Sequence, residues 1–249
     1  MENYESATYG DAIAGVYDRL YGGRPDAEHA AAFLSVLAGG GRALELGIGT
    51  GRIAVPLAAS GVEVHGIDAS EAMIGHLRGK AAAAGIRAAV GDFADLAMDT
   101  RFDLIYAVFS SFFGLTTQDA QVTCFARVAE HLADPGVFVV EAFVPDPSRY
   151  AQGRYVGVTH VETDSAGIDL SLHDAVNQTV STQHVLMETS GTRLFPSLIR
   201  YAWPAELDLM ARLGGLRLRD RWSDWSRSPF MSASRNHVSV YERVAATTA

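Results

Sequence analysis

Short apolar runs alternate with helical patterns from residue 41 to residue 143. The helical patterns carry apolar residues three and four positions apart, as over residues 118–133. The last run is apolar except for Glu141, as expected of a parallel strand buried on both faces. This alternation of strand and helix predicts an α/β fold with a mostly parallel sheet. The five predicted strands span residues 43–46, 62–68, 87–90, 102–109 and 137–143.

The pattern changes after residue 144. Polar and apolar residues alternate from residue 154 to residue 201 among β-forming side chains, which predicts three or four antiparallel strands. A helix over 204–213 follows, and strands over 216–222 and 237–243 form a terminal antiparallel hairpin. We therefore expect three parts, which are a helical cap (1–40), an α/β domain (41–153 and 202–249) and an antiparallel β insertion (154–201).

One face of this insertion is apolar. We expect that face to cover either the substrate crevice or a second copy of the chain, because helices already cover the other surfaces of the main sheet. Both can hold if strands from two chains pair, which favours a homodimer. The apolar residues of this face are Val156, Val158, Ile168, Leu170, Leu172 and Val185.

Composition narrows the class of protein. A chain of 249 residues, 48% hydrophobic and 20% charged, fits one globular domain with a small insertion. The net charge of −9 argues against a nucleic-acid partner. The single cysteine, Cys124, excludes an intramolecular disulfide, and no apolar run approaches the roughly 20 residues that span a bilayer. We expect a cytoplasmic protein without a membrane partner.

A glycine-rich loop follows the first strand. Gly47, Gly49 and Gly51 lie between a strand and a helix, where the backbone can approach a ligand closely. A dinucleotide fingerprint would place its third glycine at Arg52, and no Gly-Lys-Ser/Thr of a phosphate loop is present. Glu45 at the strand end disfavours a pyrophosphate and favours a ligand with cationic groups. The alternative is a tight structural turn.

Acidic residues follow the first three strands. Glu45, Asp68 and Asp92 come at the carboxyl ends of neighbouring parallel strands, where loops converge on one crevice. Asp68 lies 17 residues after Gly51, close to the position of an acid that binds a ribose diol in such folds. Three acids beside a glycine loop predict one binding site.

The pattern E-x-G-x-G-x-G resembles the cofactor loop of class I S-adenosylmethionine (SAM) methyltransferases. The resemblance implies a Rossmann-like, mostly parallel seven-stranded sheet and SAM, whose sulfonium and ammonium fit the acidic loops. It also implies that Asp92 accepts a hydrogen bond from the adenine amine and that Phe93 lines the adenine slot. The implied cofactor-binding residues are Tyr17, Tyr21, Arg24, Glu45, Gly47, Gly49, Gly51, Asp68, Ala69, Met73, Gly91, Asp92, Phe93 and Phe109.

The chain is also similar to amino-sugar N-methyltransferases of macrolide biosynthesis and to their relatives in secondary metabolism. The matching segments are residues 17–24, 109–112 and 139–141. This resemblance implies that Tyr17 or Tyr21 lies near the methionine end of SAM and that Arg24 pairs with its carboxylate. The chain has Ala-Phe-Val at 142–144 where those enzymes carry tryptophans, so the substrate class stays open.

Candidates for acid–base chemistry are few. A base is required only if the nucleophile arrives protonated. His160 and His173 are the first candidates because both lie in strands expected to roof the site, and Tyr17 could act by hydrogen bonding. His184 and His237 are further histidines of this region, and no spacing of ligands indicates a metal. Trp222 and Trp225 belong either to the core of the hairpin or to an aromatic wall of the substrate site.

These features predict a SAM-dependent methyltransferase with a small-molecule substrate, in natural-product biosynthesis. The acceptor atom, nitrogen, oxygen or carbon, stays open. Two alternatives also stay open. One is a methyltransferase-like cyclase that retains SAM as a structural ligand, and the other is a non-catalytic interaction module.

Overall fold

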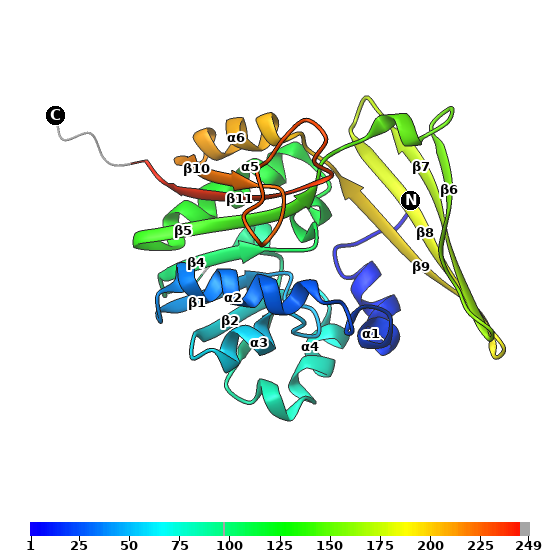
Figure 1. Cartoon of the computed structure of the whole chain (residues 1–249), viewed down its shortest axis with the longest axis horizontal. Helices are drawn as coiled ribbons and strands as arrows, with labels where there is room; N and C mark the ends of the chain where they lie inside the picture. Colours follow the sequence, from blue (N-terminus) through cyan, green and yellow to red (C-terminus); the bar gives the residue numbers. More distant parts are fainter. Residues whose placement is uncertain (97, 245–249) are drawn as a thin grey trace.

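The computed structural model describes residues 1–96 and 98–244, so residues 245–249 of the predicted α/β domain lie outside it. A seven-stranded sheet with the order β10-β11-β5-β4-β1-β2-β3 forms the centre of the α/β domain (Figure 1). Its strands are parallel except β11, which is antiparallel to both β5 and β10. The predicted fold class is confirmed. The strands are β1 (Arg42–Leu46), β2 (Glu63–Asp68), β3 (Arg87–Val90), β4 (Phe102–Ala107), β5 (Leu132–Phe143), β10 (Leu216–Trp222) and β11 (Asn236–Arg243).

Helices cover both faces of this sheet because its apolar side chains alternate between the faces. Ala43 packs into the cluster of α2 (Asp26–Ala38), α3 (Ala54–Ala59) and α4 (Glu71–Arg78). Its neighbour Leu44 packs on the opposite side, into the cluster of α5 (Gln118–His131) and α6 (Pro204–Leu213). This is the three-layer arrangement expected when a parallel sheet is buried on both faces.

Two predicted boundaries are wrong. The fourth strand ends at Ala107 rather than at residue 109, because Phe109 and Ser110 adopt positive φ angles of 54° and 61° that end the extended backbone. The fifth strand begins at Leu132, directly after α5, so the helix predicted to reach residue 133 ends at His131.

The insertion forms a separate four-stranded antiparallel sheet, β6-β7-β8-β9, which we call the roof (Figure 1). The helix α1 (Thr8–Tyr21) lies between the roof and the α/β domain. Its buried Ile13 and Val16 pack with Met73 of α4 and Phe195 of the roof, so the cap joins the two sheets. The strands of the roof are β6 (Arg154–Val161), β7 (Ser165–Asp174), β8 (Thr179–Glu188) and β9 (Gly191–Arg200).

The two faces of the roof differ in chemistry. Val156, Val158 and Leu172 on one face are 70%, 69% and 63% exposed. The opposite face carries polar residues that lie side by side through the strand register, such as Asp169 opposite His184. We call these the outer and the inner face of the roof.

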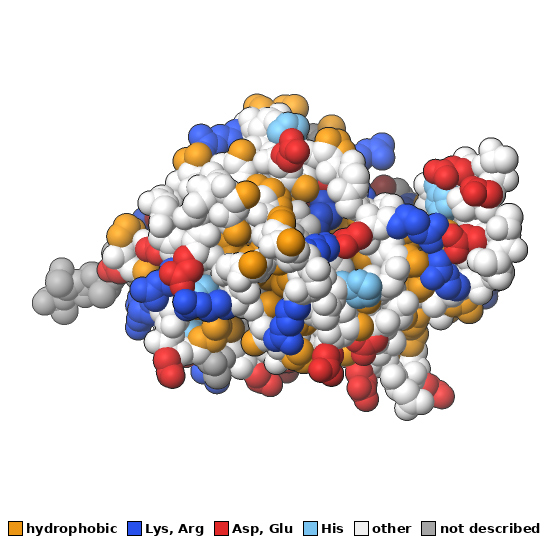
Figure 2. All heavy atoms as spheres, turned by 90° about the horizontal axis from the view of Figure 1, so that it is seen from below, with side chains coloured by type: hydrophobic (Ala, Val, Ile, Leu, Met, Phe, Trp, Pro, Cys, Tyr) orange, Lys and Arg blue, Asp and Glu red, His pale blue; other side chains and the backbone are white. Residues whose placement is uncertain are grey.

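Charges are mixed on the surface shown in Figure 2. Small groups of Lys and Arg side chains lie among Asp and Glu side chains, and those described on this face form no continuous basic surface. Among the helices of residues 1–96 and 98–244, none has both the length and the apolar character needed to cross a bilayer.

Candidate active site

The glycine loop is fixed by its backbone conformation and by Asp68. Gly47 and Gly49 have φ angles of 79° and 54°, in the left-handed region that favours glycine. The Gly49 N–H donates to Asp68 Oδ2 over 2.8 Å, and the Ser70 N–H donates to Asp68 Oδ1 over 2.9 Å. One carboxylate therefore holds together the loops that follow β1 and β2.

A cavity of about 390 Å³ lies over this loop and reaches the inner face of the roof. It brings together nine of the residues implied by the methyltransferase resemblance. These are Tyr17, Gly47, Gly49, Asp68, Ala69, Met73, Asp92, Phe93 and Phe109.

The other five predicted residues lie elsewhere. Tyr21 and Arg24 line a second, larger cavity. Gly51 and Gly91 are required by close packing. A Cβ added at Gly51 would clash with Leu77 Cδ1, and a Cβ added at Gly91 would lie 3.0 Å from Ile67 Cδ1. Glu45 is buried in the strand beneath the loop.

Burial changes the ionisation expected of Glu45. The Tyr106 hydroxyl donates to Glu45 Oε2 over 3.0 Å. Burial raises the pKa of Glu45 to about 8, although the Tyr106 hydrogen bond and the Arg52 charge oppose the shift. Burial therefore favours the protonated form of Glu45 in the chain without ligand, which opposes its interpretation as a fixed negative charge.

Asp68 differs from Glu45 because backbone amides solvate it. Burial also raises the pKa of Asp68, while the Ser70 and Gly49 N–H groups oppose the shift. The carboxylate lines the cavity, as Glu45 does not. Asp68 and Asp92 are therefore the acids at the loop end of the cavity that a cationic ligand can reach.

Phe109 stands between the two cavities and lines both. Its left-handed backbone is held by Glu141, whose carboxylate accepts from the Phe109 N–H over 2.5 Å. The ring lies under two guanidinium groups, with Arg24 Cζ at 4.9 Å and Arg52 Cζ at 4.7 Å from its centroid. Phe109 is thus placed by a buried carboxylate and two cations.

Sequence reasoning did not predict a role for Arg52. Its side chain is only 7% exposed and pairs with Asp26 over 2.8 Å. The Arg52 charge also opposes the burial that raises the Tyr17 pKa to about 12. The sequence does mark this residue in one way, because it directly follows Gly51, the last glycine of the loop.

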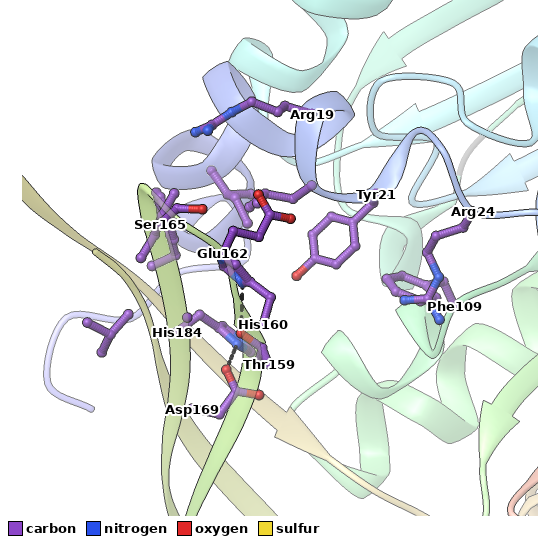
Figure 3. Close-up of a pocket in the computed structure, with 16 residues that line it drawn as sticks. Arg19, Tyr21, Arg24, Phe109, Thr159, His160, Glu162, Ser165, Asp169 and His184 are labelled. Carbon is purple, nitrogen blue, oxygen red and sulfur yellow. Dashed lines mark hydrogen bonds and ion pairs between the residues drawn. The ribbon is translucent and has the colours of Figure 1, made fainter. Parts of the chain in front are cut away.

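The second cavity, of about 700 Å³, opens between α1, Phe109 and one end of the roof (Figure 3). Tyr21 and Glu162 point into it from opposite sides (Figure 3). Asp169 and His184 line this cavity and the smaller one, as Phe109 does. The two cavities therefore meet at these three residues.

The inner face of the roof forms the wall opposite the glycine loop. The Ser171 and Thr182 hydroxyls lie 2.9 Å apart across β7 and β8. His184 Nδ1 lies 2.7 Å from Asp169 Oδ1, and its Nε2 lies 2.9 Å from Ser197 Oγ. All five residues line the smaller cavity.

Strand parity places the predicted apolar face away from both cavities. Leu170 is 42% exposed on the outer face, whereas Ser171 points to the cavity. Of the six apolar residues expected to cover either the substrate crevice or a second copy of the chain, Val185 alone lines one of these cavities. The polar residues at the alternate positions of the strands face inward, so this face does not cover the cavities and the second alternative stays a prediction.

The predicted catalytic residues are separated. His160 lines the larger cavity, and Tyr17 lines the smaller one. His173 lines neither, since its ring stacks on Tyr150 at 4.4 Å and its Nε2 lies 2.9 Å from the Tyr201 hydroxyl. His237 is buried in β11, where burial lowers its pKa to about 3.

Trp222 and Trp225 were predicted to lie either in the core of the hairpin or at the substrate site. Trp222 and Trp225 pack edge-on against Phe33 of α2 at 5.5 and 5.4 Å, in the core behind the main sheet, and line neither cavity.

Over residues 1–96 and 98–244, no group of three or more His, Cys, Asp or Glu side chains is arranged to hold a metal ion.

Known proteins resemble this chain over its whole length. The methyltransferase CcbJ from Streptomyces caelestis is 41% identical in sequence, with a TM-score of 0.92 over 97% of this chain and 100% of that one. The methyltransferase-domain family matches residues 43–136. This chain belongs to the methyltransferases.

More distant relatives agree with this assignment. The cypemycin N-terminal methyltransferase of a Streptomyces species is 27% identical over 80% of this chain and 82% of its own length. The fold is shared with SAM-bound CalS10, an amino pentose methyltransferase from Micromonospora echinaspora involved in calicheamicin biosynthesis. That structure is 23% identical, with a TM-score of 0.72 over 92% of this chain and 97% of its own. The predicted family is confirmed and, at the level of the family, so is the cofactor S-adenosyl-L-methionine.

The residues of this methyltransferase fit that cofactor. Two carboxylates, Asp68 and Asp92, and the Phe93 ring line the smaller cavity beside the glycine loop. Its one lysine or arginine among the described lining residues is Arg149, next to the roof, so the loop end has no cluster of cations for phosphates. The lining favours a ligand with positive charge and an aromatic base.

Proposed function

We propose that the chain transfers the methyl group of SAM to a small-molecule acceptor of natural-product biosynthesis, bound under the inner face of the roof. One observation carries this proposal. The smaller cavity runs from Gly47 and Asp68 at the loop to Thr182 and Ser197 of the roof, so it has one end for the cofactor and one for an acceptor.

The loop end would hold the cofactor. Asp68 is placed to accept from the ribose hydroxyls, and Asp92 and Phe93 to bind the adenine. When bound, SAM supplies a methyl group already activated on a sulfonium. The protein therefore has to align the acceptor with that group and keep water out.

Residues of the cap would close the other side. Tyr17 and Tyr21 pack together at 4.9 Å, and Tyr21 packs on Phe109 at 5.6 Å. Arg24 lies over the same ring. We assign Tyr17, Tyr21 and Arg24 to the methionine end of the cofactor, with Arg24 pairing with its carboxylate.

The roof (154–201) would act as the substrate lid. Its inner hydroxyls offer donors and acceptors to a polar acceptor molecule. The larger cavity, with Glu162 and His160, adds room for the part of the acceptor that is not methylated. The proposed site thus accommodates a molecule larger than the group that it methylates.

Calorimetric titration with S-adenosylhomocysteine tests the cofactor end, and binding is expected. Incubation with methyl-labelled SAM and a panel of amino sugars, phenols and keto acids tests the reaction. Label in an acceptor supports methyl transfer. Binding of S-adenosylhomocysteine without label in any acceptor of a broad panel would argue for the cyclase alternative, and no binding at all would refute the proposal.

A further inference from the structure

Asp169, His184 and Ser197 form a hydrogen-bonded chain on the inner face of the roof. Asp169 Oδ1 and His184 Nδ1 are 2.7 Å apart, and His184 Nε2 and Ser197 Oγ are 2.9 Å apart. Three different strands supply the residues, β7, β8 and β9. Figure 3 shows the Asp169–His184 pair at the wall of the larger cavity.

With a neutral imidazole, this geometry fits one arrangement of protons. A carboxylate only accepts, so the His184 Nδ1–H donates to Asp169. The unprotonated Nε2 then accepts from the Ser197 hydroxyl. Ser197 Oγ keeps a lone pair free for an N–H or O–H group of a molecule in the cavity.

The chain lies where an acceptor must pass. Asp169 and His184 line both cavities, and Ser197 lines the one that contains Asp68 and the loop glycines. Both side chains of the Asp169–His184 pair are accessible, at 27% and 28% exposed. The Tyr9 ring packs edge-on against His184 at 5.8 Å and limits the freedom of the imidazole.

We propose that Asp169, His184 and Ser197 are the proton relay of this methyltransferase, with Ser197 contacting the acceptor, His184 as the base and Asp169 as a positioning residue. This inference rests on the proposed function. It gives to His184 the role that sequence reasoning assigned to His160 and His173.

Methyl transfer is coupled to proton movement along this relay. A lone pair on the acceptor nitrogen or oxygen forms the bond to the methyl carbon, and the electron pair of the broken carbon–sulfur bond stays on sulfur. The proton of the acceptor moves to Ser197 Oγ while the Ser197 proton moves to His184 Nε2. The resulting imidazolium is stabilised by Asp169 and later loses its proton to water.

Nitrogen-15 NMR of the ligand-free chain tests the arrangement without any activity. We expect His184 as the Nδ1–H tautomer in the wild type, and a loss of that preference in Asp169→Asn, whose amide can also donate. An Nε2–H tautomer in the wild type would overturn the relay. This result does not depend on whether the chain methylates anything.

Kinetics with the first acceptor labelled in the panel test the base. Removal of a general base lowers rates by roughly 10²–10⁴-fold, and we expect His184→Gln to lower kcat within this range. Its Kd for S-adenosylhomocysteine should stay near that of the wild type. The exposed His29→Gln on α2 is the matched control, with kcat unchanged.

Chemical rescue separates a base from a structural residue. Added imidazole should restore part of kcat in His184→Gly, and Ser197→Thr should retain more activity than Ser197→Ala. A folded His184→Gln with wild-type kcat, or a folded His184→Gly that no imidazole rescues, would overturn the proposal. In either case label transfer by the wild type would leave the methyltransferase assignment intact.

Discussion

The loop end and the roof end of one cavity are built in opposite ways. At the loop end, the glycines of residues 47–51 directly follow one strand and Asp68 ends the neighbouring strand, so each feature is marked by its place after or at the end of a strand. At the roof end, Asp169, His184 and Ser197 are 15 and 13 positions apart and meet only through strand register. The first region can be recognised in a sequence as a motif, and the second cannot.

The two ends also differ in electrostatics. At the loop end, the carboxyl groups of Asp68 and Asp92 line the cavity. The roof end presents neutral hydroxyls and one His–Asp pair. A cationic cofactor suits the first end, and a polar acceptor suits the second. The variants below separate these two roles.

The largest effect is expected from Asp68→Ala at the loop end. It removes the acceptor of the Gly49 and Ser70 N–H groups and a carboxylate of the cavity. Hydrogen bonds to charged groups contribute about 1.5–3 kcal/mol, so affinity for S-adenosylhomocysteine should fall roughly tenfold to a hundredfold. Calorimetry gives the Kd, with Asp68→Asn as the isosteric comparison. An unchanged Kd would exclude Asp68 from the cofactor site.

Glu45→Gln tests the buried carboxyl of the same end. The folded pKa of about 8 lies above the ordinary value of 4.5, so between these values the folded state holds a proton that the unfolded chain has lost. The free energy of unfolding should therefore fall as pH rises through this window, by about 1.4 kcal/mol per pH unit for this group. Urea denaturation of the ligand-free chain at pH 5.5, 6.5 and 7.5 should show this slope relative to Glu45→Gln. Parallel curves for the two proteins would contradict the protonated state of Glu45.

Local signals explain what the sequence could predict. The side chain of Ser70 caps α4 by accepting from the Met73 N–H, and the helix predicted over 204–213 has the predicted bounds. These features depend on residues within one turn of each other. The glycine loop carries a local signal of the same kind, because the glycines of residues 47–51 permit the positive φ angles that the loop adopts.

The face of the roof that points to the site could not be predicted from the sequence. Its strands were predictable from alternation, but alternation alone does not say which parity faces the site. The apolar parity does not face the cavities, because the wall carries polar groups and leaves Val156 and Leu170 outside. Phe109 likewise looked like the end of a strand, since only the contact with Glu141, 32 positions away, holds its backbone in the left-handed region.

Adjacent residues of β7 sharpen the contrast between the two faces. Ser171→Leu fills the cavity and leaves Thr182 without its cross-strand partner, so kcat/KM for the acceptor should fall about tenfold, or 1.4 kcal/mol. Affinity for S-adenosylhomocysteine should stay close to that of the wild type. Leu170→Ser on the outer face is the matched control and should retain kcat/KM. Equal losses in the two variants would mean that the roof acts through stability alone.

The smallest effect on activity is expected on the outer face. Val158 and Leu172 are exposed there, and the predicted homodimer would cover them. Analytical ultracentrifugation of Val158→Lys with Leu172→Lys tests this, with a monomer expected for the variant and a dimer for the wild type. Methyl transfer per chain should change by less than about twofold, as for surface substitutions. A monomeric wild type would contradict the predicted homodimer.

A crystal structure with S-adenosylhomocysteine tests the division of the cavity most directly. The account predicts the adenine beside Asp92 and Phe93, the ribose on Asp68, and the sulfur atom facing the inner face of the roof near Ser197 and His184. An acceptor under the roof would then stand in line with the methyl group. A sulfur atom that faces away from the roof, with no path from it to Ser171, Thr182 or Ser197, would contradict the account.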